Sequence, residues 1–185
     1  MLETKCILHL QNGNKQEGKL TILFETGHEI NKFVEFSINN VKQKISLDSI
    51  ESYEIDGNFY YPKILDIDFN GSEKFLFVKR LSNENSRMQL YELYQKKKQN
   101  SDPSDFYYYF LSFPNRDIKR PVNLASKQIT PNFDEKMSKL LKDCPVLSNK
   151  VENKKKGYFF SQYSLGNYKK TEVLLRIINE YDSCK

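Results

Sequence analysis

Tryptophan is absent from this sequence, and histidine and cysteine are scarce, with two and three copies among 185 residues. Without tryptophan, the large aromatic side chains of the core must come from 13 phenylalanines and 12 tyrosines. Neither His9 nor His28 has neighbours at the spacing of metal ligands or of a catalytic triad. Glycine-rich phosphate loops and the Gly-x-Ser-x-Gly and His-Glu-x-x-His motifs are also missing. The sequence therefore identifies no catalytic residue, no metal ligand and no cofactor.

Long apolar runs are missing as well, so we expect no membrane-spanning segment. The first residues, Met1 to Lys5, lack the charged and apolar regions of a signal peptide. Two interpretations follow: a cytoplasmic protein, or an exported protein whose leader is not part of this chain. The cysteines described below favour export, so we expect a periplasmic or extracellular location, with the cytoplasm as the alternative.

Charge is only mildly unbalanced, with 29 Lys and Arg against 24 Asp and Glu, a net charge of +5. Such a charge permits contact with nucleic acid or anionic lipid but does not require it. Two basic runs, Lys96-Lys97-Lys98 and Lys154-Lys155-Lys156, are not interleaved with aromatic residues. Solvated loops are the simpler interpretation of such runs, so we expect nucleic acid not to be the partner.

The first two thirds of the chain carry the patterns of β-structure. Residues 4–10 alternate between apolar and polar, and turn signals at Asn12-Gly13, Asn39-Asn40 and Asp56-Gly57 predict three hairpins. Further strands are expected at 74–81, 88–94 and 105–113, with a polar loop over 95–104. Short strands at this spacing predict a mainly β fold, an antiparallel β-barrel or roll over residues 1–125.

The C-terminal part has helical spacing instead. Phe133, Met137 and Leu141 recur along one face, Pro145 interrupts the pattern, and a last helix is expected from about Tyr168 to Asp182. We expect residues 126–185 to form a helical tail packed on the β-domain. The tail is too small to hold a core of its own, so we predict one cooperative unit.

Cys144 and Cys184 close two amphipathic segments and lie 40 positions apart. We predict a disulfide, which would stabilise the chain by about 4 kcal/mol in the chain-entropy model. The alternative is two buried thiols, since cysteine also behaves as a small apolar residue. Cys6 lies on the apolar side of the first strand, where a buried free thiol is expected.

Asp66, Asp68 and Glu73 flank Asn70-Gly71 in a way that resembles a calcium loop. The spacing does not match the twelve-residue pattern of such loops. We interpret these acids as part of a solvated hairpin loop.

Aromatic residues are densest on the strand that contains Tyr107 and Tyr109, whose side chains should share one face. If that face is exposed, both tyrosines offer a stacking surface for sugars, bases or protein partners. If the C-terminal helices cover it, both belong to the core, and we favour this interpretation because the helices need a surface to pack on. Tyr107 and Tyr109 are our candidate ligand-binding residues.

Several short phrases, taken in order, resemble those of uncharacterised exported β-rich proteins of the Bacteroidota. They are Gly18-Lys19-Leu20, Ile45-Ser46-Leu47-Asp48-Ser49-Ile50, Gly57 with Phe59-Tyr60-Tyr61, Leu90-Tyr91, Asp143-Cys144-Pro145 and Tyr181-Asp182-Ser183-Cys184. The resemblance implies export and an intact Cys144–Cys184 bridge. It implies no activity.

Three functions remain open from the sequence. The first is a non-enzymatic envelope or secreted module that binds a protein or glycan ligand. The second is a nucleic-acid-binding small β-barrel. The third is an enzyme whose site is assembled from scattered residues and is not readable from the sequence.

Overall fold

The computed structural model describes residues 2–22, 33–65, 74–99, 102–116, 121–124, 132–160 and 167–184. The chain divides into two compact units. The first unit is Met1–Asp66 with Gly71–Lys79, and the second is Ile67–Asn70 with Arg80–Lys185. Each unit has its own cluster of buried apolar side chains. The expected single cooperative unit, with a β-domain over 1–125 and a tail over 126–185, stays a prediction.

The first unit is an antiparallel sheet with strand order β7-β6-β5-β1-β2-β3-β4. Its strands are β1 Leu2–Leu10, β2 Lys15–Ile22, β3 Phe33–Ile38, β4 Val41–Ser46, β5 Ile50–Ile55, β6 Asn58–Leu65 and β7 Lys74–Arg80. A single 3-10 turn, Leu47–Ser49, joins β4 to β5. Among the described strands, β4 pairs only with β3, so the sheet is open and not a closed barrel. The three expected hairpins are confirmed.

Residues with positive φ make the tight turns between these strands. Asn39 and Asn40 have φ of 49° and 66°, and Asp56 and Gly57 have φ of 49° and 72°. Two successive positive φ values define the type I′ turn, whose twist matches that of the flanking strands. Asparagine, aspartate and glycine tolerate this region best, and for this reason the sequence signals located the turns correctly.

Alternating side chains of the first unit form its core. Leu8, Leu20, Phe36 and Ile50 are completely buried. Cys6 is a buried free thiol, as expected, and burial raises its pKa to about 11. A protonated, buried thiol behaves as an apolar core residue and not as a nucleophile.

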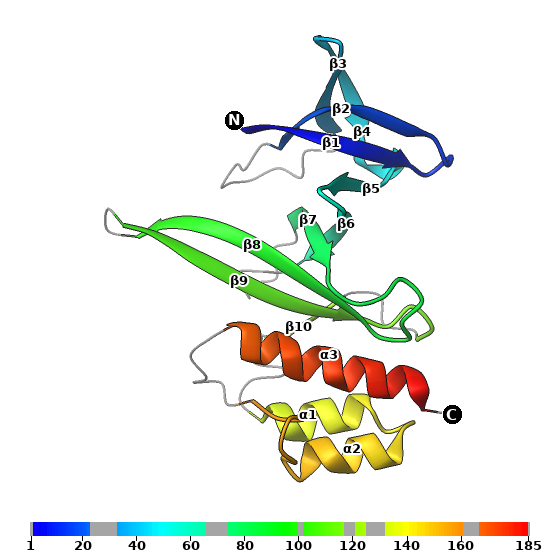
Figure 1. Cartoon of the computed structure of the whole chain (residues 1–185), viewed down its shortest axis with the longest axis vertical. Coiled ribbons are helices and arrows are strands. Elements are labelled where there is room, and N and C mark those ends of the chain that lie inside the picture. The colour runs from blue at the N-terminus through cyan, green and yellow to red at the C-terminus, as the bar shows by residue number, and fades with distance from the viewer. Residues whose placement is uncertain are drawn as a thin grey trace. The chain divides into compact units, whose positions relative to one another are not determined.

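In its described residues, the second unit combines three strands and three helices (Figure 1). The strands are β8 Gln89–Gln99, β9 Asp102–Ser112 and β10 Val122–Asn123, in the order β10-β9-β8. The helices are α1 Phe133–Leu140, α2 Pro145–Glu152 and α3 Asn167–Ser183. The mainly β fold with a C-terminal helical segment is therefore confirmed.

The prediction of a polar loop over residues 95–104 is wrong, because β8 continues to Gln99 and β9 begins at Asp102. The two strands keep a regular register here, with Gln95 opposite Phe106. A ladder is held by backbone groups, which polar residues supply as well as apolar ones, so composition alone does not end a strand. Pro103 lies next to the beginning of β9, near a strand end where proline is tolerated.

The helices and one face of β8 and β9 share the second core. Pro145, which interrupts the helical pattern of the sequence, is the first residue of α2. The first residue of a helix needs no backbone N–H donor, so proline is accommodated there. The completely buried members of this core are Met88, Leu90, Leu111, Met137, Leu141, Leu147, Val151, Ile177 and Ile178.

We predict that Gly18→Ala lowers the free energy of unfolding by about 1–3 kcal/mol through overpacking. A Cβ at this position would lie 2.6 Å from the ring of Phe36 and 2.5 Å from the Ser37 carbonyl oxygen. Phe36 is completely buried and has no room to move. Urea denaturation measures the loss, and Glu17→Ala at the next, exposed position is the control. Equal stability of both variants would contradict the prediction.

Candidate functional site

A pair of exposed tyrosines lies on β8 and β9. Tyr94 and Tyr107 are direct cross-strand partners, with ring centroids 5.3 Å apart and ring planes inclined by 49°. Their side chains are 44% and 39% exposed. Tyr94 was not among the sequence candidates, because only the register of β8 against β9 reveals that it faces Tyr107. We call these two residues the tyrosine pair.

Tyr109 follows Tyr107 on the same face, but it is only 7% exposed and belongs to the core of the second unit. The two candidate residues therefore have different surroundings. Tyr107 lies where the face is open to solvent, and Tyr109 lies where the face meets the helical core.

Tyr109 lies between two polar side chains. The hydroxyl of Thr171, on α3, donates to the Tyr109 hydroxyl oxygen at 3.2 Å. On the other side, Glu92 is the cross-strand partner of Tyr109. Burial raises the pKa of Tyr109 to about 12, and the nearby Glu92 carboxylate acts in the same direction, so the hydroxyl is protonated. Glu92 is half-buried and lies two residues from Tyr94 on the same face of β8.

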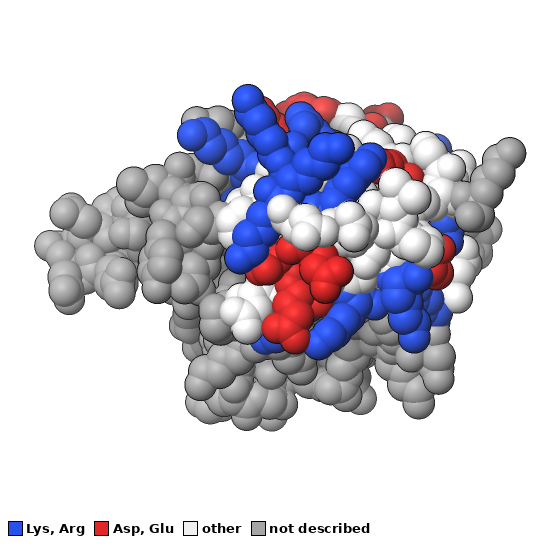
Figure 2. Space-filling model, turned by 90° about the horizontal axis from the view of Figure 1, so that it is seen from below, with Lys and Arg blue, Asp and Glu red and all other residues white. Residues whose placement is uncertain are grey.

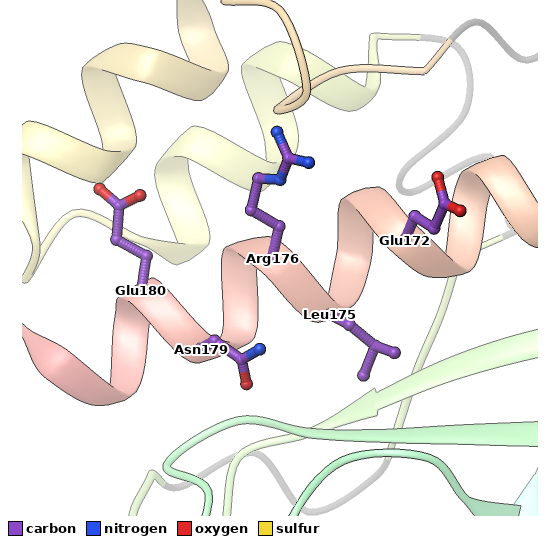
Figure 3. Close-up of a pocket in the computed structure, with 5 residues that line it drawn as sticks. All are labelled: Glu172, Leu175, Arg176, Asn179 and Glu180. Atoms are coloured by element: carbon purple, nitrogen blue, oxygen red, sulfur yellow. The ribbon is translucent and has the colours of Figure 1, made fainter.

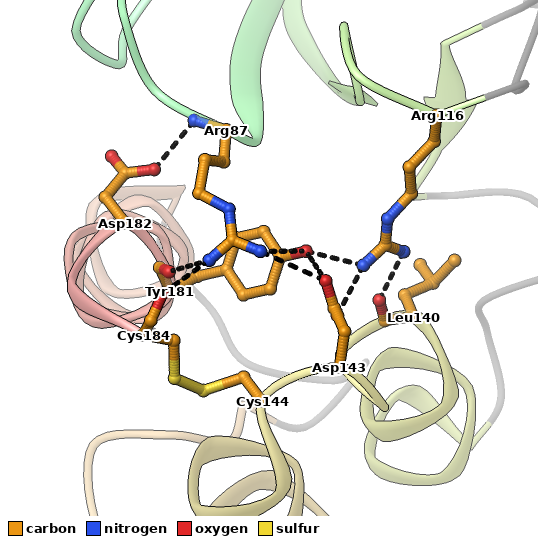
Figure 4. A network of polar contacts seen from close by, with 8 residues as sticks. All are labelled: Arg87, Arg116, Leu140, Asp143, Cys144, Tyr181, Asp182 and Cys184. Carbon is orange, nitrogen blue, oxygen red and sulfur yellow. Dashed lines mark hydrogen bonds and ion pairs between the residues drawn. A yellow bond between two sulfur atoms is a disulfide. The ribbon is translucent and has the colours of Figure 1, made fainter.

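A second polar network surrounds Asp143, in the turn between α1 and α2 (Figure 4). Its carboxylate accepts hydrogen bonds from Arg116 Nη2 at 2.6 Å, from Arg87 Nη2 at 3.1 Å and from the Tyr181 hydroxyl at 2.5 Å. Burial acts to raise the pKa of Asp143, but the hydrogen bonds from Tyr181 and Arg116 and the Arg116 charge outweigh it and lower the pKa. The Arg87 guanidinium also lies 4.3 Å from the centroid of the Tyr181 ring.

The same arginines bind the ends of two helices. Arg87 Nη1 donates to the carbonyls of Tyr181 and Cys184 at 3.1 and 2.7 Å, and Arg116 Nη1 donates to the carbonyl of Leu140. Carbonyls at a helix C-terminus lack partners within the helix and carry partial negative charge, so a cation there satisfies both needs.

The expected Cys144–Cys184 disulfide is present beside this network (Figure 4). Its Cα atoms are 5.9 Å apart, an ordinary separation for a bridge. It joins the start of α2 to the end of α3. We call the disulfide together with Arg87, Arg116, Asp143 and Tyr181 the clasp. Its contacts join the ends of α1 and α3 to the start of α2, so we assign it a structural role.

A shallow hollow of about 590 Å³ lies along α3 (Figure 3). Its lining residues are Glu172, Leu175, Arg176, Asn179 and Glu180. The charged side chains point to one side of the helix, and Leu175 and Asn179 point to the other. Polar groups that diverge in this way do not assemble around a single reacting atom.

Glu180 of α3 contacts α2 and the turn that follows it. Its carboxylate pairs with Lys150 and accepts a hydrogen bond from the Tyr158 hydroxyl. Burial acts to raise the pKa of Glu180, but these two hydrogen bonds outweigh it and lower the pKa. Glu180 is therefore an ionised structural carboxylate and not a general acid at neutral pH.

Basic and acidic side chains lie beside one another on the face seen from below in Figure 2. The Lys154–Lys156 run is exposed, as expected, but Lys154 pairs with Asp134 at 3.3 Å and lies 5.2 Å from the Phe159 ring. The run is therefore partly neutralised. For Lys96–Lys98 only the backbone is described.

The remaining residues considered as metal or catalytic candidates are the two histidines and the acids of residues 66–73. His9 is 9% exposed near the end of β1 and contacts Glu54 at 3.2 Å. His28 and the acids of residues 66–73 lie outside the described residues. Within the described ranges, no group of three or more potential metal-ligating side chains occurs. None of the described helices is long and apolar enough to cross a membrane.

Comparison with known proteins gives no match to a family model, to a curated protein or to a solved structure. The resemblance to exported Bacteroidota proteins therefore stays a prediction.

The disulfide should stabilise the second unit by about 4 kcal/mol at most, as expected for the loop that it closes. We expect Cys144→Ala/Cys184→Ala, or wild-type protein in reductant, to lose this stability in urea denaturation. Without reductant, only Cys6 should be alkylated after unfolding. Alkylation of all three cysteines, in protein made under oxidising conditions, would contradict the bridge.

The lowered pKa of Asp143 predicts an acid-dependent loss of stability. Its contribution is complete above the ordinary carboxyl pKa of 3.8 and disappears as the pH falls through the lower folded-state pKa. Asp143→Asn should flatten this part of the pH profile and lower stability at pH 7 by about 1 kcal/mol, a low value because Asp143 is partly exposed. Thermal unfolding from pH 2 to 7 measures the profile, and Glu152→Gln, at an exposed position of α2, is the control. Parallel profiles for Asp143→Asn and wild type would refute the assignment.

Proposed function

We propose that the protein is a non-enzymatic envelope or secreted module that binds a protein or glycan ligand through the tyrosine pair. The observation that carries this proposal is the exposure of Tyr94 and Tyr107 on a face whose other aromatic residue, Tyr109, is buried. Tyrosine combines a large apolar ring with a polar tip and is enriched where one surface binds another.

The position of the pair supports this role. Each ring is carried by a paired strand, and direct cross-strand contact restricts both side chains. Because both tyrosine side chains are already restricted before a ligand binds, binding costs little additional side-chain entropy.

The disulfide supports the proposed location. Stable structural disulfides form and persist in oxidising compartments such as the periplasm and the extracellular space. We propose export on this basis and on the phrases around Cys144 and Cys184 that resemble exported proteins.

Capture from the cells that produce the protein tests the proposal. We expect the immobilised, disulfide-bonded chain to retain one or more envelope or secreted components, and Tyr94→Ser/Tyr107→Ser to lose them. Phe33→Ser is the matched control, because Phe33 is another exposed aromatic residue, 54% exposed and in the first unit. Circular dichroism checks that each variant is folded. Equal retention by the double variant and the wild type would remove the tyrosine pair from the proposed function.

A further inference from the structure

We propose that the tyrosine pair and Glu92 form a platform for a saccharide, specifically a neutral or amino sugar within an oligosaccharide. The inference rests on the proposed function and assigns its ligand class. It depends on two chemically different groups lying side by side on one face of β8 and β9: the exposed rings of the tyrosine pair and the half-buried carboxylate of Glu92.

The rings provide the apolar half of the recognition. The face of an aromatic ring carries partial negative charge, and the C–H bonds on the face of a sugar ring carry partial positive charge. The planes of Tyr94 and Tyr107 are inclined by 49°, so they present two surfaces that are not parallel. Such a pair fits neighbouring, mutually rotated sugar rings better than one extended flat ligand.

Glu92 provides the polar half. An ionised carboxylate only accepts hydrogen bonds, and its bonds to hydroxyl donors are stronger than those between neutral groups. Glu92 lies opposite Tyr109 and two residues from Tyr94 on the same face of β8, and it is only half-buried, so a ligand on the tyrosine pair can reach its carboxylate. Vicinal hydroxyls of a sugar are donors of the required kind.

The spacing allows one ligand to use both halves. Residues i and i+2 of a strand are about 7 Å apart on the same face, and directly paired residues are about 5 Å apart. Glu92, Tyr94 and Tyr107 therefore lie within the reach of one or two sugar rings.

The sign of the charge narrows the ligand further. A uronic acid or other anionic sugar would bring a second carboxylate against Glu92, and like charges disfavour binding. A neutral sugar avoids this penalty, and a protonated amino sugar gains from the attraction.

An oligosaccharide array tests the inference on the complete, disulfide-bonded chain. The array carries neutral, amino and uronic acid oligosaccharides, and the affinity for each bound ligand is then measured by calorimetry. We expect binding to neutral or amino ligands and none to uronic acid ligands. Tyr107→Ala and Tyr94→Ala should each weaken binding about tenfold, as loss of one aromatic contact does.

Conservative variants separate recognition from folding. Tyr94→Phe should bind within about twofold of the wild type, because the ring surface remains, and Phe33→Ala should be unchanged. Glu92→Gln should weaken neutral ligands several-fold and reduce the discrimination against uronic acid ligands. A Glu92→Gln variant with unchanged affinity and selectivity would overturn the role of the carboxylate.

The outcomes also distinguish this inference from the proposed function. If no oligosaccharide binds at millimolar concentration, but the capture from cells still depends on the tyrosine pair and is abolished by protease treatment of the captured component, the ligand is a protein. The saccharide inference then fails and the proposed function stands. If neither experiment depends on the tyrosine pair, both fail.

Discussion

The arrangement of the second unit depends on one carboxylate, Asp143, that meets two guanidinium groups and a tyrosine hydroxyl. Charge-assisted hydrogen bonds of this kind are directional, so they specify how the turn between α1 and α2 is oriented against the end of α3. The arginines simultaneously satisfy helix-end carbonyls that have no partner within their helices. The apolar core supplies the driving force for packing, and the clasp selects one geometry among those that the core would permit.

Much of the fold follows from local sequence signals. The features that could not be predicted from the sequence share one cause, which is their dependence on long-range pairing. Turn residues such as Asn39, Asn40 and Gly57 determine the hairpins through their own backbone preferences, and Pro145 marks the start of a helix. The continuation of β8 to Gln99 depends instead on pairing with β9, which no local pattern in a polar segment encodes. The open order of the first sheet is likewise a property of long-range pairing.

The candidate surface shows the same limit. Tyr107 was recognisable because aromatic residues cluster around it in sequence, but its partner Tyr94 and the carboxylate of Glu92 come from another strand. The different burial of Tyr107 and Tyr109 arises from where α3 lies along the face, which a strand pattern alone does not contain. One face of β8 and β9 thus serves as core at one end and as surface at the other, and Tyr109, which accepts a hydrogen bond from Thr171 of α3, lies at the transition.

The bridge between Cys144 and Cys184 also encloses a segment of chain that includes all of α2 and α3. A peptide bond cut anywhere inside this segment leaves two polypeptides that are still joined through sulfur. Because Arg87 binds the carbonyls of Tyr181 and Cys184, the severed C-terminal piece would keep its contacts with the rest of the unit. A cut between the last two helices would therefore leave both fragments attached to the protein.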